Sequence, residues 1–202
     1  MACGITTAAS ADTITVAALG DSLTQGYGLP PQDGLVPQMQ TWLDQQGEDV
    51  SLLNAGVSGD TTAGGLARID WTLSPDVDAL IVALGGNDVL RGIDPANSLA
   101  NLDGIMARAA AADIPVLLIG MQAPGNFGPD YKQSFDAIYP DLAQQYDALL
   151  VDDFFAGIGV SDLSAARDLM QADGIHPNAQ GVAQIVAALG PRVQELIAVA
   201  GE

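Results

Sequence analysis

Ala79-Leu80-Ile81-Val82-Ala83-Leu84 is a continuous apolar stretch that runs directly into Gly85-Gly86-Asn87-Asp88. A strand with no polar alternation is typical of a parallel sheet that helices cover on both faces. The polar residues that follow such a strand lie at the carboxyl edge of the sheet, where ligands bind in open α/β folds. This stretch therefore predicts an α/β fold and places Asn87 at a candidate binding edge.

Segments of strand length alternate with segments of helical periodicity along the chain. The expected strands are Thr13–Leu19, Val50–Leu53, Ala79–Leu84, Pro115–Ile119 and one that starts at Leu149–Val151. The expected helices are Leu35–Gln46, Leu66–Leu73, Asn97–Ala112, one that includes Asp136–Tyr146, and Ala179–Val199 with a candidate interruption at Gly190-Pro191. This alternation predicts a parallel sheet with helices on both faces. We expect one domain over residues 13–202, after a poorly ordered leader of residues 1–12.

Composition limits the classes of partner. Hydrophobic residues make up 49% of the chain and charged residues 15%, which allows a sizeable core. The formal net charge of −19 comes from 25 acidic and 6 basic side chains. Such a surface repels nucleic acid and anionic headgroups, so we expect no nucleic-acid partner. We assign the charge to solubility, and salt adaptation stays open. No continuous apolar run approaches the roughly 18 residues that cross a bilayer, so we expect no membrane span.

The leader, Met1–Asp12, contains the only cysteine, Cys3, so no intramolecular disulfide can form. We interpret Cys3 as incidental. The leader lacks the positive and long apolar regions of a signal peptide. It is compatible with the remnant of a processed N-terminus, so a periplasmic or secreted location and a cytoplasmic one both stay open. The oligomeric state is open as well.

The single histidine, His176, lies in Asp173-Gly174-Ile175-His176-Pro177-Asn178. Any imidazole chemistry near neutral pH depends on it. Asp173 precedes it by three positions, which lets both side chains point the same way from a tight turn. Ser22 follows the first expected strand, within Gly20-Asp21-Ser22-Leu23. A serine hydroxyl becomes a good nucleophile when a base takes its proton, so these residues are a candidate nucleophile, base and orienter. Alternatively, Ser22 caps a helix and His176 is an ordinary loop residue.

Acyl transfer also needs donors for the developing oxyanion, each contributing about 3–4 kcal/mol at the transition state. Candidate donors are the backbone N–H of Ser22, that of Gly59 in the Gly-rich segment after the second strand, and the carboxamide of Asn87. Taken singly, Gly59 also fits an ordinary turn and Asn87 a turn or helix N-cap. Asp21 and Asp60 flank these positions, and we assign them no catalytic role.

Four blocks, in this order, resemble the SGNH (GDSL) hydrolase family. They are Gly20-Asp21-Ser22-Leu23, Ser58-Gly59-Asp60-Thr61, Gly85-Gly86-Asn87-Asp88 and Asp173-Gly174-Ile175-His176-Pro177. The resemblance runs from about Thr13 to about Leu196. Within the family, the chain is most similar to the bacterial branch of multifunctional thioesterase/lysophospholipases and arylesterases.

This resemblance implies a flavodoxin-like three-layer α/β/α sandwich around a five-stranded parallel sheet. It implies Ser22 as nucleophile, His176 as base and then acid, and Asp173 as orienter. Ser22, Gly59 and Asn87 then form the oxyanion hole. It implies no metal and no cofactor, and one His with one Cys makes a His/Cys zinc site hard to build.

The expected function is that of a serine esterase that forms an acyl-enzyme on Ser22. Expected substrates are small-molecule acyl esters of short to medium chain length, including aryl esters, with thioesters and lysophospholipids as further candidates. The resemblance implies that residues 89–94 and 123–131 border the acyl pocket. No large apolar lid is apparent, which argues against a long-chain triglyceride lipase. Two alternatives stay open: a carbohydrate O-acetylesterase on the same site, and a non-catalytic acyl-binding protein. A binder needs no intact nucleophile, base and orienter, which disfavours the second.

Overall fold

In the computed structural model, five strands form one sheet in the order β2-β1-β3-β4-β5, and every neighbouring pair is parallel. The structure describes residues 13–159 and 163–202. The expectation of a poorly ordered leader concerns residues 1–12 and lies outside the described residues. The strands are β1 Ile14–Gly20, β2 Val50–Gly56, β3 Ala79–Ala83, β4 Val116–Ile119 and β5 Leu149–Val151.

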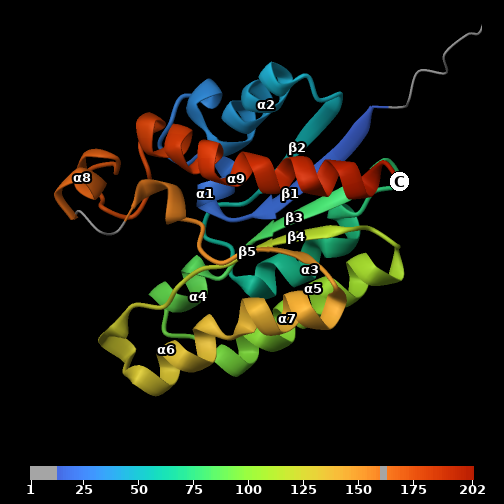
Figure 1. Cartoon of the computed structure of the whole chain (residues 1–202). Helices are drawn as coiled ribbons and strands as arrows, with labels where there is room; N and C mark the ends of the chain where they lie inside the picture. The colour runs from blue at the N-terminus through green and yellow to red at the C-terminus, as the bar shows by residue number, and fades with distance from the viewer. Residues whose placement is uncertain (1–12, 160–162) are drawn as a thin grey trace, which may run out of the picture.

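Helices cover both faces of the sheet (Figure 1). On one face lie α1 Ser22–Gln25, α2 Leu35–Gln46 and α9 Ala179–Ala200. On the other lie α3 Thr62–Thr72, α5 Pro95–Ala111 and α7 Ile138–Tyr146. The short helices α4 Gly86–Leu90, α6 Pro129–Asp136 and α8 Leu163–Asp168 gather at the end toward which the strands point. The three layers and the parallel five-stranded sheet confirm the predicted α/β/α fold.

The core fills both interfaces between sheet and helices. β3 and β4 are buried along their whole length, as expected of strands covered on both faces. Leu43 of α2 and Ile105 of α5 are fully buried on opposite sides of the sheet. Burial of apolar side chains on both faces therefore holds the sheet firmly between its two layers of helices.

The order of the strands places the polar loops together. β2 and β3 pair with opposite sides of β1. The connection after β1 therefore runs to one side of it, and the connection after β2 crosses back to the other side. In open parallel sheets a crevice forms at such a switch point, outside the carboxyl ends of the strands. Ser22 follows β1, Gly59 follows β2 and Asn87 follows β3. The topology therefore brings these three residues to one edge.

Strand β2 is longer than its side chains predict. The expected strand ended at Leu53, but pairing with β1 continues to Gly56, which lies opposite Gly20. The Asn54 carboxamide caps this extension by donating to the carbonyls of Thr24 and Gln25. A Cβ on Gly56 would lie 2.3 Å from the backbone nitrogen of Gln25, so only glycine allows α1 to pack this closely. Backbone pairing and a tight helix contact therefore extend a strand through residues that favour turns.

The helices differ from expectation at a few boundaries. The segment that includes Asp136–Tyr146 forms two helices, α6 and α7, separated at Ala137. Pro140 has no N–H to donate to the carbonyl of Asp136, which favours the break at this point. The helix expected over Leu66–Leu73 begins earlier, at Thr62, where the side chain of Thr61 caps it. Three short helices, α1, α4 and α8, were not expected at all because each has too few residues to show a periodicity.

Helix α9 continues through Gly190-Pro191 without the candidate interruption. Its apolar side chains are buried on both sides of Pro191, so packing outweighs the lost backbone hydrogen bond. A Cβ on Gly190 would lie 2.6 Å from the Trp42 ring, so glycine lets α2 approach here.

By length and by a mean hydropathy of 1.3, α9 is the one helix among the described residues that could cross a membrane. The expectation of no membrane span rested on continuous apolar runs, and α9 is not one because it contains Arg192 and Glu195. That expectation stays a prediction. The core helix of a folded domain passes the same test, and 44% of the apolar window of α9 is buried inside the protein.

Candidate active site

Ser22, Asp173 and His176 form one hydrogen-bonded chain. The Oγ atom of Ser22 lies 2.8 Å from Nε2 of His176, although 154 positions separate them in the sequence. The other ring nitrogen, Nδ1, lies 2.7 Å from Oδ2 of Asp173. Nucleophile and base within hydrogen-bond reach, with the base oriented by a third group, is the arrangement that activates a hydroxyl. The structure therefore brings together all three residues that the sequence singled out.

A tight turn presents Asp173 to His176. Oδ1 of Asp173 accepts the backbone N–H groups of Ile175 (2.9 Å) and His176 (3.0 Å), while Oδ2 faces the imidazole. Gly174 lies between them at φ +67°, in the left-handed region that favours glycine. The backbone N–H of His176, its ring N–H and the N–H of Ile175 together lower the pKa of Asp173 to about 2. The carboxylate is therefore charged wherever His176 is able to act as a base.

Ser22 is the first residue of α1, and Asp21 is its N-cap. Oδ1 of Asp21 accepts the N–H of Leu23 at 2.9 Å, which starts the helix directly after β1. The first N–H groups of a helix have no acceptor within it, so the Ser22 N–H is available to a ligand. The sequence therefore places the hydroxyl and a backbone donor at the same strand end.

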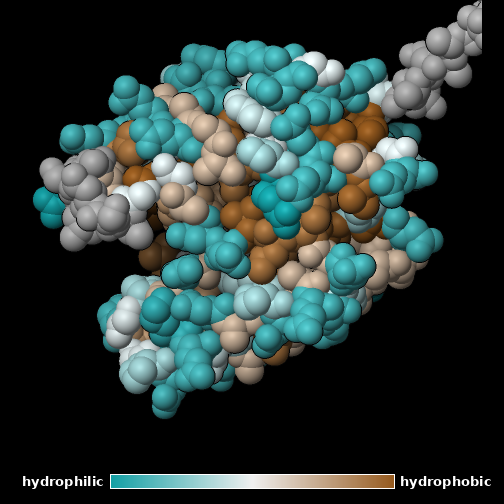
Figure 2. All heavy atoms as spheres, viewed as in Figure 1, coloured by the Kyte–Doolittle hydropathy of each residue, from teal (hydrophilic) through white to brown (hydrophobic). Residues whose placement is uncertain are grey.

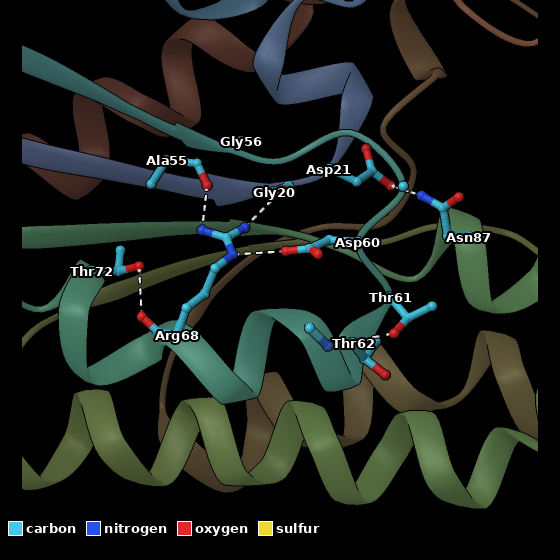
Figure 3. Close-up of polar contacts among 12 residues, drawn as sticks. Gly20, Asp21, Ala55, Gly56, Asp60, Thr61, Thr62, Arg68, Thr72 and Asn87 are labelled. Carbon is cyan, nitrogen blue, oxygen red and sulfur yellow. Dashed lines mark hydrogen bonds and ion pairs between the residues drawn. The ribbon is translucent and has the colours of Figure 1, made fainter.

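The other two expected donors lie in the same region. Nδ2 of Asn87 donates to Oδ2 of Asp21 at 3.2 Å (Figure 3). Gly59 has φ +83°, and its carbonyl accepts a hydrogen bond from Nη2 of Arg91 at 2.8 Å. Asp21 is only 2% exposed, and this burial raises the pKa of its carboxyl group against the lowering effect of the Leu23 and Asn87 donors. Sequence reasoning gave Asp21 no role, but the structure shows that it contacts an expected oxyanion donor.

One cavity of about 1130 Å³ contacts Ser22, Gly59, Asn87 and His176. In Figure 2 the surface is hollowed between the region of α8 and that of α4 and α6, and apolar residues lie in the hollow. The apolar lining residues are Leu23, Val89, Leu90, Met121, Pro124, Phe155, Ile158, Ala166, Met170 and Ile175. The site can therefore hold an apolar chain next to the Ser22 hydroxyl.

The expected pocket segments contribute only in part. Val89, Leu90 and Pro124 line the cavity. Tyr131 instead donates its hydroxyl to the carbonyl of Ile93, and its ring lies tilted against that of Phe127 with the centroids 4.9 Å apart. Six lining residues that follow β5 were missed because no motif marks them: Phe155, Ile158, Ala166, Arg167, Met170 and Gln171. The one available signal was the position of the segment that contains them: it follows the fifth strand, and that strand also ends at the carboxyl edge of the sheet.

Arg68 joins three segments around the site (Figure 3). Its Nε atom binds Oδ2 of Asp60 at 2.7 Å, Nη1 binds the carbonyl of Ala55 at 2.6 Å, and Nη2 binds the carbonyl of Gly20 at 2.8 Å. The planar guanidinium thus fixes the last residues of β1 and β2 relative to the loop that follows Gly59. Sequence reasoning missed Arg68, although it is one of only 6 basic residues.

Asp88 joins the helices that follow the two loops. Its carboxylate is fully buried and accepts three hydrogen bonds. Thr62 donates two of them, from its backbone N–H (2.9 Å) and its hydroxyl (2.6 Å), and the Ser98 hydroxyl donates the third (2.9 Å). The start of α4, which carries Asn87, is thereby attached to the start of α3, which follows Gly59. Within residues 13–159 and 163–202, no group of three or more His, Cys, Asp or Glu side chains is placed to hold a metal ion.

Residues 18–184 match the GDSL-like Lipase/Acylhydrolase family. Esterase TesA of Pseudomonas aeruginosa is 39% identical over 194 residues, which cover 96% of this chain and 93% of that protein. Thioesterase 1/protease 1/lysophospholipase L1 of Escherichia coli K12 is 35% identical over 191 residues, 94% of this chain and 87% of that protein. The crystal structure of AlinE4, an SGNH-hydrolase family esterase, superposes with a TM-score of 0.75 at 43% identity and covers 93% of this chain and 98% of that chain. These similarities confirm the resemblance that the four sequence blocks indicated.

Proposed function

Because the chain belongs to the GDSL-like lipase/acylhydrolase family and is a serine esterase, a carboxylic ester hydrolase, we propose that its acyl-enzyme forms on Ser22. His176 is the general base and then the general acid, and Asp173 orients it. The observation that carries this assignment is the hydrogen-bonded chain from Ser22 Oγ to His176 to Asp173, at 2.8 and 2.7 Å.

The first half of the reaction transfers the acyl group to the enzyme. Ser22 Oγ attacks the carbonyl carbon while Nε2 of His176 takes its proton. Asp173 accepts the Nδ1–H and stabilises the imidazolium with its charge. The tetrahedral intermediate then collapses, and His176 protonates the departing oxygen or sulfur. In the second half, His176 takes a proton from water, the hydroxide attacks the acyl-enzyme, and the proton returns to Ser22 Oγ.

The N–H groups of Ser22 and Gly59 and the carboxamide of Asn87 receive the oxyanion in this proposal. All three residues contact the cavity beside the hydroxyl, which supports the assignment. One N–H of Asn87 Nδ2 is bound to Asp21, and the amide has a second N–H for the substrate. Each such donor contributes about 3–4 kcal/mol to the transition state, so together they supply a large part of the rate enhancement.

The cavity favours small acyl esters of short to medium chain length, including aryl esters. Its volume of about 1130 Å³ and its apolar lining suit an aliphatic or aromatic group. Thioesters and lysophospholipids are further candidate substrates, because the E. coli relative is named a thioesterase and lysophospholipase. The same lining disfavours a carbohydrate O-acetylesterase, since sugar hydroxyls that are placed against apolar side chains lose their hydrogen-bond partners. A non-catalytic acyl-binding role is disfavoured because a binder does not require the aligned hydroxyl and imidazole.

The test is covalent labelling. A fluorophosphonate ester should add one phosphonyl group to Ser22, located by peptide mass spectrometry, and Ser22→Ala should stay unlabelled and inactive with its fold intact. A protein that is active on p-nitrophenyl esters but carries no adduct on Ser22 would contradict the assignment. Comparing p-nitrophenyl esters of graded length with acetylated sugars and acyl-CoA then ranks the substrate classes, and preference for the sugars would overturn the proposed class.

A further inference from the structure

One side chain outside the proposed triad links the loop that carries the base to the segment that carries the nucleophile. Nε2 of Gln171 donates to the carbonyl of Tyr27 at 2.9 Å and to the carbonyl of Pro177 at 3.0 Å. Tyr27 comes shortly after α1, whose first residue is Ser22, and Pro177 follows His176 directly. A single amide group therefore bridges two segments that are 144 positions apart in the sequence.

The backbone of Gln171 also closes the turn that presents His176. Its N–H donates to the carbonyl of His176 at 2.8 Å, and its carbonyl accepts the N–H of Gly174 at 3.0 Å. Met170 and Pro177 form an antiparallel bridge beside these bonds. The orientation of His176 is thus set from both ends of its turn by contacts that involve Gln171.

Few other hydrogen bonds among the described residues join these two regions. One is nearby: Nε2 of Gln38 donates to the carbonyls of Asp33 and Ala179, and Ala179 lies three positions after His176. Between residues 21–34 and residues 169–178, the hydrogen bonds found there are Gln171 to Tyr27 and Ser22 to His176. The remaining polar or aromatic contact between the two segments is the Tyr27 ring, whose centroid lies 4.8 Å from that of His176. Tyr27 is itself held through the carbonyl that Gln171 binds. Among these contacts, the Gln171 amide is the hydrogen bond that ties the Tyr27 segment directly to the turn that carries His176.

The site around Gln171 is built for close approach. Gly28 has φ +75°, and a Cβ there would lie 2.2 Å from Oε1 of Gln171. Glycine at this position lets the carboxamide pass against the backbone of the Tyr27 segment, where any side chain would displace it. The amide fits only when both segments have their present spacing.

We propose that Gln171 is a positioning residue of the esterase reaction, which holds the imidazole of His176 in line with Ser22 Oγ. The proposal rests on the proposed function of those two residues. A small misplacement of reacting groups costs up to about a hundredfold in rate, so loss of this link slows every step in which His176 moves a proton. Both formation and hydrolysis of the acyl-enzyme use His176, so both should slow. Gln171 also lines the cavity, so a replacement of similar length is needed to keep ester binding nearly unchanged.

The test replaces the amide by a thioether of similar length, Gln171→Met. We expect kcat for a p-nitrophenyl ester to fall about ten- to a hundredfold, with KM within about twofold of wild type. Gln40→Met is the matched control, because Nε2 of Gln40 also makes two hydrogen bonds, to the carbonyl of Val50 (2.9 Å) and to Oδ1 of Asp44 (2.8 Å), at the start of β2 and away from the base. The control should lose comparable stability in urea and keep the wild-type kcat.

A double variant separates positioning from general loosening of the fold. In the His176→Ala background, Gln171→Met should cause no further loss of the residual rate, because groups that act as a unit are not additive. Should Gln171→Met not fold, Gly28→Ala displaces the same amide and should reproduce the kcat loss. The proposal is overturned if Gln171→Met has the same kcat as the matched control, or if Gln171→Met lowers the rate as strongly without His176 as with it. Fluorophosphonate labelling of Ser22 in wild type tells this failure apart from a failure of the proposed function.

Discussion

At the scale of single residues, two carboxylates beside Ser22 have opposite environments. Asp173 accepts three N–H groups, and these hydrogen bonds lower its pKa to about 2. Asp21 is buried, and the loss of solvent raises its pKa. Asp173 therefore carries a negative charge beside His176 over the working pH range. Asp21 lies beside Asn87, and its burial makes a negative charge on its carboxyl group costly. The contrast arises from backbone geometry and burial, because the two side chains are chemically identical.

The low pKa of Asp173 predicts the shape of the acid limb of activity. As pH falls from about 8 to 4, Asp173 stays charged because its pKa is lowered to about 2, so this carboxyl group should add no second ionisation to the acid limb of kcat/KM. A pH-stat assay of ester cleavage measures this limb, and a slope of two would contradict it.

The same pKa predicts a stability effect. A depressed carboxyl pKa stabilises the fold above the ordinary value of 3.8, and this contribution is lost as pH falls toward about 2. Asp173→Asn should therefore destabilise the protein at pH 7 and have no such effect near pH 2. Urea titrations of both proteins at the two pH values decide this.

Replacement of the base and of its orienter should have graded effects. His176→Ala should lower kcat by about 10⁶-fold and Asp173→Asn by about 10⁴-fold, because the orienter supports the base without replacing it. Steady-state assays with circular dichroism as a fold control measure both. If Asp173→Asn proved the more damaging change, another role would have to be found for this carboxylate.

At the scale of helices and strands, the site depends on side chains that fix where elements end. Arg68 holds the last residues of β1 and β2, and Asp88 holds the first turns of α3 and α4. Each of these side chains has its partners on a different element. The hydrogen bonds of Arg68 and Asp88 therefore position the loop that contains Gly59 and the first turn of α4 that contains Asn87.

Removal of the buried Asp88 carboxylate should lower the stability of the fold. Asp88→Ala leaves the Thr62 N–H and two hydroxyls without their acceptor in a fully buried site, so we expect a loss of about 3–5 kcal/mol in the free energy of unfolding. Asp70→Ala is the matched control, because the Asp70–Arg108 pair is more than half exposed and should change stability by less than about 0.5–1 kcal/mol. Urea unfolding measures both, and equal losses would contradict this role of Asp88.

Local sequence signals predicted the fold and the proposed triad well, and contacts between distant residues were beyond them. The apolar run before Asn87 is enough to predict a buried strand. Asp173 and Gly174, which form the turn around His176, are its neighbours in the sequence, so that turn can be predicted from local residues too. Gln171 and Arg68, in contrast, have functions only through partners up to 144 positions away. The end of β2 was missed for the same reason, because pairing with β1 overrides the turn preference of Asn54 and Gly56.

At the scale of the whole molecule, negative charge dominates. Of the 6 basic side chains, Arg68, Arg108, Lys132 and Arg192 form ion pairs with carboxylates, and the formal net charge is −19. Like charges on a compact surface repel one another, which destabilises the fold relative to the expanded chain. The fold therefore has to overcome this repulsion, and dissolved ions should weaken it.

Salt should accordingly stabilise this protein. We expect Tm to rise as NaCl increases from about 10 mM to about 150 mM, over which the screening length falls from about 30 to 8 Å. Most of the gain should come below about 0.5 M, which distinguishes screening from hydration effects that keep growing. Calorimetry over a salt series measures this, and a Tm that is constant below 150 mM would show that the repulsion is negligible.

The 154 positions between Ser22 and His176 also govern when catalysis begins during synthesis. β1 and Ser22 leave the ribosome early, whereas His176 lies directly before α9 and emerges late. A nascent chain therefore exposes a hydroxyl without its base, and polysomes that carry unfinished chains should have no ester-cleaving activity. If Ser22 and His176 act together as proposed, activity starts only when α9 has emerged and packed on the sheet.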